Sequence, residues 1–229
     1  MTNSKIKVEK YIEHTLLKPD ITHSQLIKLF DEAREHNFLG VCINPLYVKE
    51  AKDYLKDTEV KVVTVIGFPL GASKTEVKQF ETQQAIKDGA DEIDMVIDIA
   101  ALKDKNYQKA QDDVAGVVKA CNGTPLKVIL ETDLLTKDEI EQACHICVKA
   151  GAQFVKTSTG FVKGGIGAKP EDVKLMHDIV APHGLLVKAS GGVKDINAAL
   201  KVIEAGASRI GTSSGVAIVE GVVNEQSGY

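Results

Sequence analysis

The feature that most constrains this chain is an eightfold alternation of short apolar runs with longer segments of helical periodicity. The runs are rich in Val and Ile, and in the segments between them apolar residues recur as on one face of a helix. Buried parallel strands read as continuous apolar runs, as VVTVI at 62–66 and KVIL at 127–130 do. The expected strands are residues 12–16, 40–43, 60–66, 92–97, 126–131, 154–157, 185–189 and 209–211. This pattern predicts a repeated βα unit.

Helix start and stop signals lie between the expected strands. In a capping box, a Ser or Thr and a Glu or Gln three residues later each accept a hydrogen bond from the other's backbone N–H. The pairs that fit are Thr22 with Gln25, Ser73 with Glu76, and Thr136 with Glu139. Gly-Ala pairs at 89–90, 151–152 and 206–207 precede strands, and a glycine there can end a helix in the left-handed conformation. The segments between the strands are therefore expected to be crossover helices.

Eight parallel strands joined by helices close most naturally into a barrel, because closure removes the exposed sheet edges. The length of 229 residues is near the roughly 250 typical of that fold. We predict an α/β chain in which residues 1–229 form a single (β/α)8 TIM-barrel catalytic domain with a short N-terminal helical segment. The alternative, an open doubly wound sheet, usually carries G-x-G-x-x-G or G-x-x-x-x-G-K-[ST], and neither motif occurs here.

Composition argues against several partners and locations. Lys and Arg number 28 against 32 Asp and Glu, and a net charge of −4 gives no global attraction to nucleic acid or anionic lipid. No apolar stretch approaches the roughly 20 residues of a membrane helix, and the start, MTNSKIKVEK, lacks the apolar middle of a secretory signal. The 4 cysteines are too few and too scattered for a disulfide framework. We expect a cytoplasmic protein with no nucleic-acid or membrane partner.

Two lysines stand where active-site residues of a TIM barrel are expected, at the carboxyl ends of strands. Lys156 ends the run FVK and Lys188 the run LVK, on neighbouring strands. One interpretation is structural, with the lysines paired to Glu131 or Asp133 at the barrel mouth. The other makes one lysine a Schiff-base nucleophile, which requires a neutral amine. Burial and a second cation nearby both favour that neutral form.

A carboxylate supplies the remaining chemistry. If the strand at 92–97 points Asp94 inward, the carboxylate lies across the barrel from the lysines and could shuttle protons through a water. Its neighbours Asp91 and Glu92 are interpreted as the solvated start of this strand. We therefore single out Asp94 as the candidate acid–base group.

Glycine and serine clusters follow the last two strands, at Ser190-Gly191-Gly192 and at 211–214 (Gly-Thr-Ser-Ser). This is the usual phosphate position of a TIM barrel. Glycines let backbone amides approach an anion, hydroxyls donate to it, and a helix N-terminus adds a favourable dipole. Either cluster alone could be an ordinary tight turn. Together they predict a phosphate-bearing substrate.

The chain resembles the class I deoxyribose-phosphate aldolases in seven motifs: I-E-H-T-L-L-K at 12–18, V-C-I-N-P at 41–45, V-I-G-F-P-L-G at 65–71, E-I-D-M-V at 92–96, F-V-K-T-S-T-G-F at 154–161, V-K-A-S-G-G-V at 187–193 and R-I-G-T-S-S-G at 209–215. The resemblance implies that Lys156 forms the Schiff base while Asp94 and Lys188 relay protons. The phosphate contacts that it implies are Gly160, Gly191, Gly192, Gly211, Ser213 and Ser214.

The implied reaction is reversible cleavage of 2-deoxy-D-ribose 5-phosphate to D-glyceraldehyde 3-phosphate and acetaldehyde, with no metal or organic cofactor. Tyr229 resembles a terminal tyrosine that reaches the site in relatives, and it is a candidate for proton transfer at C2; an ordinary chain end is the alternative. Some relatives carry a phosphate-contacting lysine where this chain has Phe161, and Lys163 could compensate. Family habit suggests a homodimer.

Other interpretations remain open at this point. A phosphate-binding barrel isomerase would use the lysines only electrostatically, and a non-catalytic sensor would bind sugar phosphates without turnover. Cys144 and Cys147 form C-x-x-C, but they lie on an apolar helical stripe, which favours core packing over zinc. The 6 histidines are dispersed, unlike a metal-dependent aldolase site. His14 alone is expected near the pocket, and a structural role for it is equally open.

Overall fold

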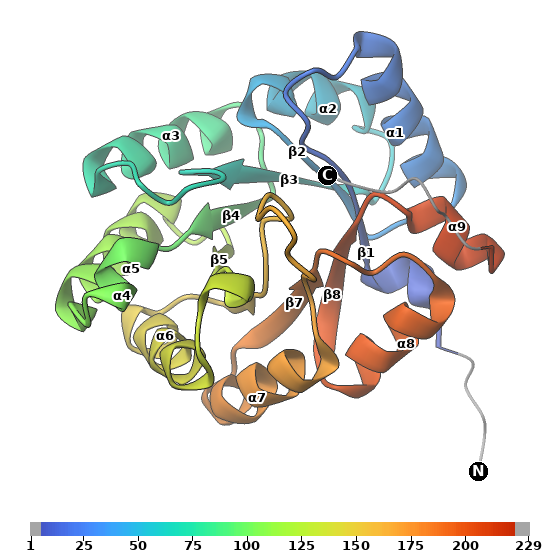
Figure 1. Ribbon diagram of the computed structural model, residues 1–229. Helices are drawn as coiled ribbons and strands as arrows, with labels where there is room; N and C mark the ends of the chain where they lie inside the picture. Colours follow the sequence, from blue (N-terminus) through green and yellow to red (C-terminus); the bar gives the residue numbers. More distant parts are fainter. Residues whose placement is uncertain (1–5, 223–229) are drawn as a thin grey trace.

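A closed barrel of eight parallel strands forms the centre of the structure (Figure 1). The computed structural model describes residues 6–222. Each strand pairs in parallel with the next, and β8 pairs with β1, so the predicted TIM barrel is confirmed. The strands are β1 Ile12–Leu16, β2 Gly40–Ile43, β3 Lys61–Ile66, β4 Glu92–Val96, β5 Leu126–Ile129, β6 Phe154–Lys156, β7 Leu186–Ser190 and β8 Ala207–Thr212. The predicted N-terminal helical segment is the 3-10 helix η1, Val8–Tyr11.

Helices surround the barrel and connect its strands (Figure 1). They are α1 His23–Glu35, α2 Val48–Tyr54, α3 Thr75–Lys87, α4 Ile99–Lys103, α5 Tyr107–Cys121, α6 Lys137–Ala150, α7 Pro170–Val180, α8 Ile196–Glu204 and α9 Gly215–Glu220. Short 3-10 helices are η2 Pro45–Tyr47, η3 Thr132–Leu134 and η4 Ala181–His183. The connection from β4 to β5 holds both α4 and α5, where the sequence pattern predicted one helix.

Two of the three predicted capping boxes are present. Thr22 and Thr136 each accept a bond from the backbone three residues on, and the reciprocal side-chain bonds are also made. The box predicted at Ser73 is wrong. The cap position of α3 falls one residue later, on Lys74, whose side chain makes no capping bond. The helix therefore begins at Thr75 without a polar cap.

The main apolar core lies between the barrel and its helices. Along each strand, alternate side chains face out toward the helices and in toward the barrel axis. On α1 an apolar stripe of helical spacing is buried, at Leu26, Leu29, Phe30 and Ala33. Burying a side chain of this size stabilises the fold by about 1.5–3 kcal/mol for the larger members. The outward faces of the strands are thus committed to packing, and the inward faces are left for chemistry.

The strand register brings charged residues to one level inside the barrel. Asp94 on β4 pairs with Lys127 on β5, and Lys156 on β6 pairs with Lys188 on β7. The side chains of all four are buried. Charged residues are almost never fully buried unless they are paired. Their concentration on inward-facing positions therefore marks the barrel interior as the place to examine.

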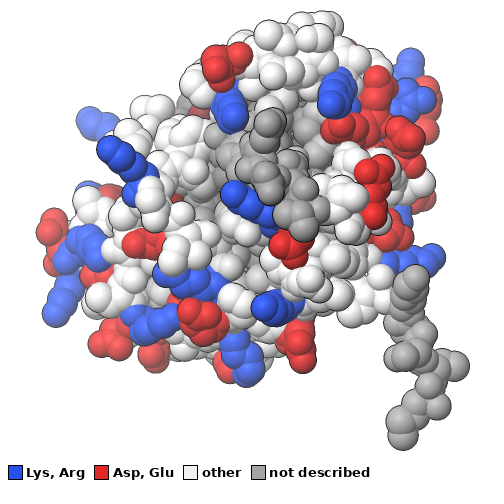
Figure 2. Space-filling view, turned by 45° about the vertical axis from the view of Figure 1, so that its right-hand side comes forward, with Lys and Arg blue, Asp and Glu red and all other residues white. Residues whose placement is uncertain are grey.

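The outer surface does not carry charge of one sign on the face in view. Figure 2 shows Lys and Arg side chains interspersed with Asp and Glu over that face. Over residues 6–222, no helix combines the length and apolar character needed to cross a membrane. A concentrated group of charged side chains lies inside the barrel instead.

Candidate active site

Three lysines converge on Asp94. The Nζ atoms of Lys156 and Lys188 both donate to Oδ2 of Asp94, at 2.8 and 2.7 Å, and Nζ of Lys127 donates to Oδ1 at 3.0 Å. Asp94 and both lysines of the predicted pair are at most 1% exposed. The expected inward orientation of Asp94 toward the lysines is present. The water expected between them is not needed, because the carboxylate accepts directly from both Nζ atoms.

Two further carboxylates lie in the same cluster. Glu13 of β1 accepts a hydrogen bond from Lys188 and lies 3.4 Å from Nζ of Lys127. Glu92 of β4 lies 2.6 Å from Nζ of Lys127 and also accepts from Lys61 at 2.5 Å. Glu92 is 1% exposed, so its interpretation as a solvated strand start was wrong. The inward alternation that points Asp94 at the axis points Glu92 there too.

Charge balance explains how so many ionised groups stay buried together. Taking one ion out of water costs several kcal/mol, which only close opposite charges can offset. Burial raises the pKa of Asp94, but Lys127, Lys156 and Lys188 outweigh it and hold that pKa well below its ordinary value. Burial lowers the pKa of Lys188, yet Asp94 and Glu13 outweigh it and raise that pKa well above the ordinary range. Asp94 is therefore an anion and Lys188 a cation.

Lys188 takes the part of the second cation in the expected lysine pair. Burial and such a cation were expected to favour a neutral member of the Lys156–Lys188 pair. The carboxylates of Glu13 and Asp94 keep Lys188 charged, so Lys188 is not that neutral member. Lys127, whose pKa is also raised, is a further positive charge of the site.

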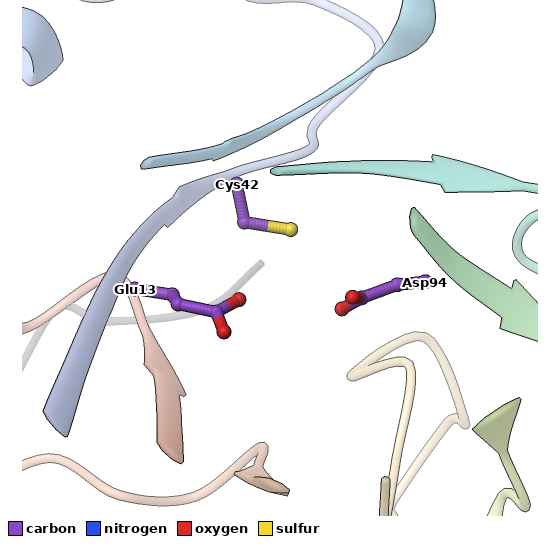
Figure 3. A group of neighbouring side chains, drawn as sticks. All are labelled: Glu13, Cys42 and Asp94. Atoms are coloured by element: carbon purple, nitrogen blue, oxygen red, sulfur yellow. The ribbon is translucent and has the colours of Figure 1, made fainter. Parts of the chain in front are cut away.

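Figure 3 displays Glu13, Cys42 and Asp94, whose side chains point toward one another inside the barrel. One ligand atom of each lies within 4.8 Å of the others, a geometry that could accommodate a metal ion. Both carboxylates already accept hydrogen bonds from Lys188, so an added metal ion would meet its ammonium group. Burial raises the pKa of Cys42, which keeps it a thiol rather than the thiolate that metals prefer. The donor set suits ammonium groups better than a metal.

The opposite wall of the barrel interior is apolar. Leu17, Cys42, Val63 and Val65 form a separate buried cluster, and Phe68 packs against it. These residues come from β2, β3 and the loops that follow β1 and β3. The barrel interior is thus charged on one side and apolar on the other.

A cavity of about 360 Å³ lies at the barrel mouth, among the residues that follow β5, β6, β7 and β8. Of the predicted phosphate contacts, Gly160, Gly191, Gly192 and Ser213 line it. Gly211 is placed deeper: a Cβ on Gly211 would lie 3.0 Å from Cε of Lys188. Ser214 lines a neighbouring pocket instead. The structure therefore brings together four of the six predicted phosphate contacts in this cavity.

The same cavity has side chains that the sequence argument did not assign to it. Lys194, in the loop after β7, supplies a cation to its lining. Its signal was available, since it follows the Gly191-Gly192 pair by two residues. Lys163, considered as a substitute for a family lysine, does not line the cavity. Phe161 packs edge-on against Phe68, with ring centroids 5.2 Å apart.

The remaining candidates lie elsewhere. His14 faces outward, where Nε2 lies 2.8 Å from Glu32 of α1, so its role is structural rather than in the lysine cluster. Cys144 and Cys147 are buried, reduced and part of the core, as the stripe predicted. Tyr229 lies outside the described residues. The structural interpretation of the lysines named the wrong partners: Lys156 pairs with Asp94, not with Glu131 or Asp133.

The sequence did contain signals for the missed residues. Lys127 is the first residue of the run KVIL, which we used only as evidence for a buried strand. A lysine in a run that must be buried requires a buried carboxylate nearby. Glu13, in the first strand, carries the same signal with opposite sign. What the sequence could not give is the register that brings these residues together.

The chain is similar to known proteins over nearly its whole length. The model of the DeoC/LacD aldolase family matches residues 7–221. A deoxyribose-phosphate aldolase of Thermococcus kodakarensis is 55% identical over 97% of this chain and 100% of its own length. Deoxyribose-phosphate aldolase 1 of Staphylococcus aureus is 56% identical over 95% of this chain and 97% of its own.

Solved structures agree with these relatives. A tetrameric deoxyribose phosphate aldolase from Aeropyrum pernix superposes with a TM-score of 0.86 at 34% identity, covering 93% of this chain and 89% of its own. The aldolase QR15 gives a TM-score of 0.88 at 41% identity, with 94% and 95% covered. The seven motifs, the barrel and the buried lysines thus have one common explanation: the chain belongs to the DeoC/LacD family of aldolases.

Proposed function

We propose that this protein is a class I deoxyribose-phosphate aldolase, which cleaves 2-deoxy-D-ribose 5-phosphate reversibly through a Schiff base on Lys156. The observation that carries the proposal is the shared bonding of Lys156 and Lys188 to one oxygen of Asp94 inside the barrel. An isomerase or a sensor would need no such arrangement. The relatives that are more than half identical to this chain are named for this activity.

The first half of the reaction forms the Schiff base. The Nζ of Lys156 first passes one proton to the carboxylate of Asp94, 2.8 Å away, and the neutral amine then adds to the C1 aldehyde of the open-chain sugar. Loss of water from the carbinolamine needs a proton for the departing hydroxyl, which Asp94 and Lys188 supply. The product is an iminium ion. Its positive charge replaces that of the ammonium, so the charge balance of the cluster is retained.

The second half breaks the carbon chain. Loss of the C3 hydroxyl proton forms the carbonyl of glyceraldehyde 3-phosphate, and the C2–C3 bonding electrons move to the iminium, leaving an enamine. Protonation at C2 and addition of water then release acetaldehyde and regenerate the amine of Lys156. We assign the relay of these protons to Asp94 and Lys188, with Tyr229 as a candidate for the C2 step.

The phosphate end is assigned to the cavity at the barrel mouth. Backbone amides of Gly160, Gly191 and Gly192, the hydroxyl of Ser213 and the ammonium of Lys194 would surround the anion. Binding at this remote end holds C1 at the amine, so binding energy is used for positioning. Gly211 and Ser214 do not line this cavity. They stay predicted phosphate contacts, which the site would have to rearrange on ligand binding to form.

The test is a coupled assay of cleavage with deoxyribose 5-phosphate and with unphosphorylated deoxyribose. We expect turnover of the phosphorylated sugar, with a KM well below that of deoxyribose. Isomerisation of the sugar phosphate without acetaldehyde release would favour the isomerase, and binding without turnover the sensor. Either result would contradict the proposal.

We further propose that residues 1–229 act as one catalytic unit. We also propose that two copies of the chain associate through α3. This helix buries Lys78 and Thr82 but exposes Val77 and Phe80, the reverse of the usual polarity. Both line a groove of about 650 Å³ with Leu70, which is 72% exposed. Exposed apolar patches of this kind mark interaction sites. A dimer mass in light scattering that Phe80→Asp abolishes and Leu200→Asp on α8 does not would support this interface; a monomeric wild type would exclude it.

A further inference from the structure

Two carboxylates line the cavity that should receive a phosphate. Glu131 and Asp133 follow β5 and face the same space as Gly160, Gly191 and Gly192. A free carboxylate there would repel the anion, since like charges at close range in a poorly solvated site cost free energy. Neither the lysine cluster nor the mechanism uses these residues. Their hydrogen bonds indicate a different task.

Glu131 holds the beginning of the loop between β6 and α7. It is 2% exposed, and both of its oxygens accept from Thr159: Oε1 from the backbone N–H at 3.1 Å and Oε2 from the hydroxyl. The Thr159 hydroxyl in turn accepts from N–H of Phe161 at 3.0 Å. Glu131 thereby fixes the turn that starts three residues after Lys156.

The backbone of Glu131 is itself unusual. Its φ of +62° lies in the left-handed region, which a residue with a Cβ adopts at a cost of order 1–3 kcal/mol. Such a conformation persists only when the surroundings impose it, and it concentrates at functional sites. Here it turns the side chain from β5 toward the β6–α7 loop. The two bonds to Thr159 are what the conformation makes possible.

Asp133 holds the other end of the same loop. Its Oδ2 accepts from N–H of Gly167 at 2.7 Å, and its Oδ1 lies 3.4 Å from Nζ of Lys169. The adjacent N–H of Ala168 donates to the carbonyl of Gly191 at 2.9 Å. Asp133 therefore holds the loop against the glycine turn that follows β7.

The loop between β6 and α7 and the glycine turn after β7 are in backbone contact. Gly167 has φ of +85°, and a Cβ on it would lie 2.4 Å from the carbonyl carbon of Gly191. A Cβ on Gly192 would lie 2.3 Å from the carbonyl oxygen of Ile166. Real Cβ atoms do not approach so closely, so a substitution at either glycine must separate the two segments. The shape of the cavity depends on this contact.

We propose that Glu131 and Asp133 are positioning residues that hold the two ends of loop 159–168 and so shape the phosphate end of the substrate site. The inference rests on the proposed function. Their charges are offset by hydrogen bonds from Thr159 and from N–H of Gly167 and by Lys169, so the two carboxylates need not repel the anion. They act through the loop and touch no reacting atom.

The experiment compares kinetics on two substrates. Asp133→Ala removes the bond to Gly167, and we expect the KM for deoxyribose 5-phosphate to rise about tenfold. We expect kcat to stay within about twofold, and kcat/KM for unphosphorylated deoxyribose to change by less than about twofold. Asp133→Asn, which can still accept from Gly167, should lie between wild type and Asp133→Ala. Inhibition by inorganic phosphate should weaken in parallel with KM.

Two further variants guard against a misfolded protein. Gly167→Ala displaces the loop by a different route and should reproduce the loss of phosphate affinity. Asp138→Asn, an equal change of charge at an exposed position on α6, is the matched control and should behave as wild type. Glu131→Gln weakens the bonds from Thr159 and so tests the other end of the loop. We expect a smaller rise in KM than in Asp133→Ala, with kcat preserved.

The outcomes separate this inference from the proposed function. Equal losses on both substrates, or unchanged phosphate affinity in Asp133→Ala and Gly167→Ala, would overturn the positioning role. A wild-type protein that cleaves neither sugar and forms no adduct with acetaldehyde would instead remove the proposed function. A loss confined to the phosphorylated sugar supports the positioning role, because general weakening of the fold would affect both substrates.

Discussion

The lysine cluster and the cavity proposed to bind phosphate are built from different parts of the chain. The cluster consists of charged side chains that point inward from β1, β4, β5, β6 and β7, held by strand register. The cavity is lined by the glycine turns after β6 and β7 together with residues that follow β5 and β8. In the proposed function the cluster supplies chemistry and is sensitive to changes of charge. The cavity supplies affinity and is sensitive to changes of backbone shape.

The largest expected effect breaks the cluster alone. Lys156→Arg should lower kcat more than about a thousandfold, because a guanidinium stays protonated and cannot add to the aldehyde. Circular dichroism and the thermal midpoint check that the barrel is retained, and binding of inorganic phosphate at the cavity should be unchanged. Turnover near the wild-type level would contradict the assignment of Lys156.

The contribution of Glu92 to the stability of the protein can be measured separately from catalysis, because it depends on pH. Burial opposes ionisation of Glu92, but Lys127 and Lys61 outweigh it and lower its pKa from 4.5 to about 2. A lowered pKa means that its contribution, roughly 3 kcal/mol to the free energy of unfolding, is present above about pH 4.5 and lost as pH falls toward 2.

Urea unfolding of wild type and Glu92→Gln, followed between about pH 2 and 7, measures this term. The difference in unfolding free energy should be largest at neutral pH and should shrink as the medium becomes acidic. A difference that does not vary with pH would indicate that Glu92 acts only through packing.

Removing the positive charge of Lys188 should change how the reaction rate depends on pH. Lys188→Leu should lower kcat about a hundredfold, the scale of one acid–base group. Lys188 is one of three lysines that lower the pKa of Asp94, so its loss should raise that pKa. The acid limb of the pH–rate profile is then expected to move to higher pH. A profile that keeps its wild-type shape would argue against the relay.

The smallest effect concerns the cavity. Ser213→Ala removes one hydroxyl from its lining and should raise the KM for deoxyribose 5-phosphate about tenfold, the lower end of the range for one hydrogen bond to a charged group. The adduct of Lys156 with acetaldehyde should form at the wild-type rate. An equal change on unphosphorylated deoxyribose would count against a phosphate contact.

The difference between the side-chain cluster and the glycine-lined cavity explains what the sequence could predict. Apolar runs and helix caps depend on local pattern, so the eight strands, the two capping boxes and the inward ends at Lys156 and Lys188 were accessible. Glu92 was misread because its exposure depends on Lys127, a partner 35 positions along the chain. The direct bond from Asp94 to both lysines depends likewise on the register of four strands.

The cavity was the less predictable half. Its glycines carry no side chain from which a direction can be read, and sequence spacing alone put Gly211 and Ser214 beside Gly191. The left-handed conformation of Glu131 has no local signal, because it arises from contacts with Thr159 on another strand's loop. Backbone shape of this kind becomes visible only when the tertiary contacts are known.

The most direct test of the central claim is reduction with borohydride in the presence of acetaldehyde, followed by peptide mass spectrometry. A Schiff base on Lys156 predicts an ethyl adduct on the peptide that contains it, and none in Lys156→Arg. Modification of a different lysine, or an active enzyme whose Lys156 peptide stays unmodified, would contradict the account.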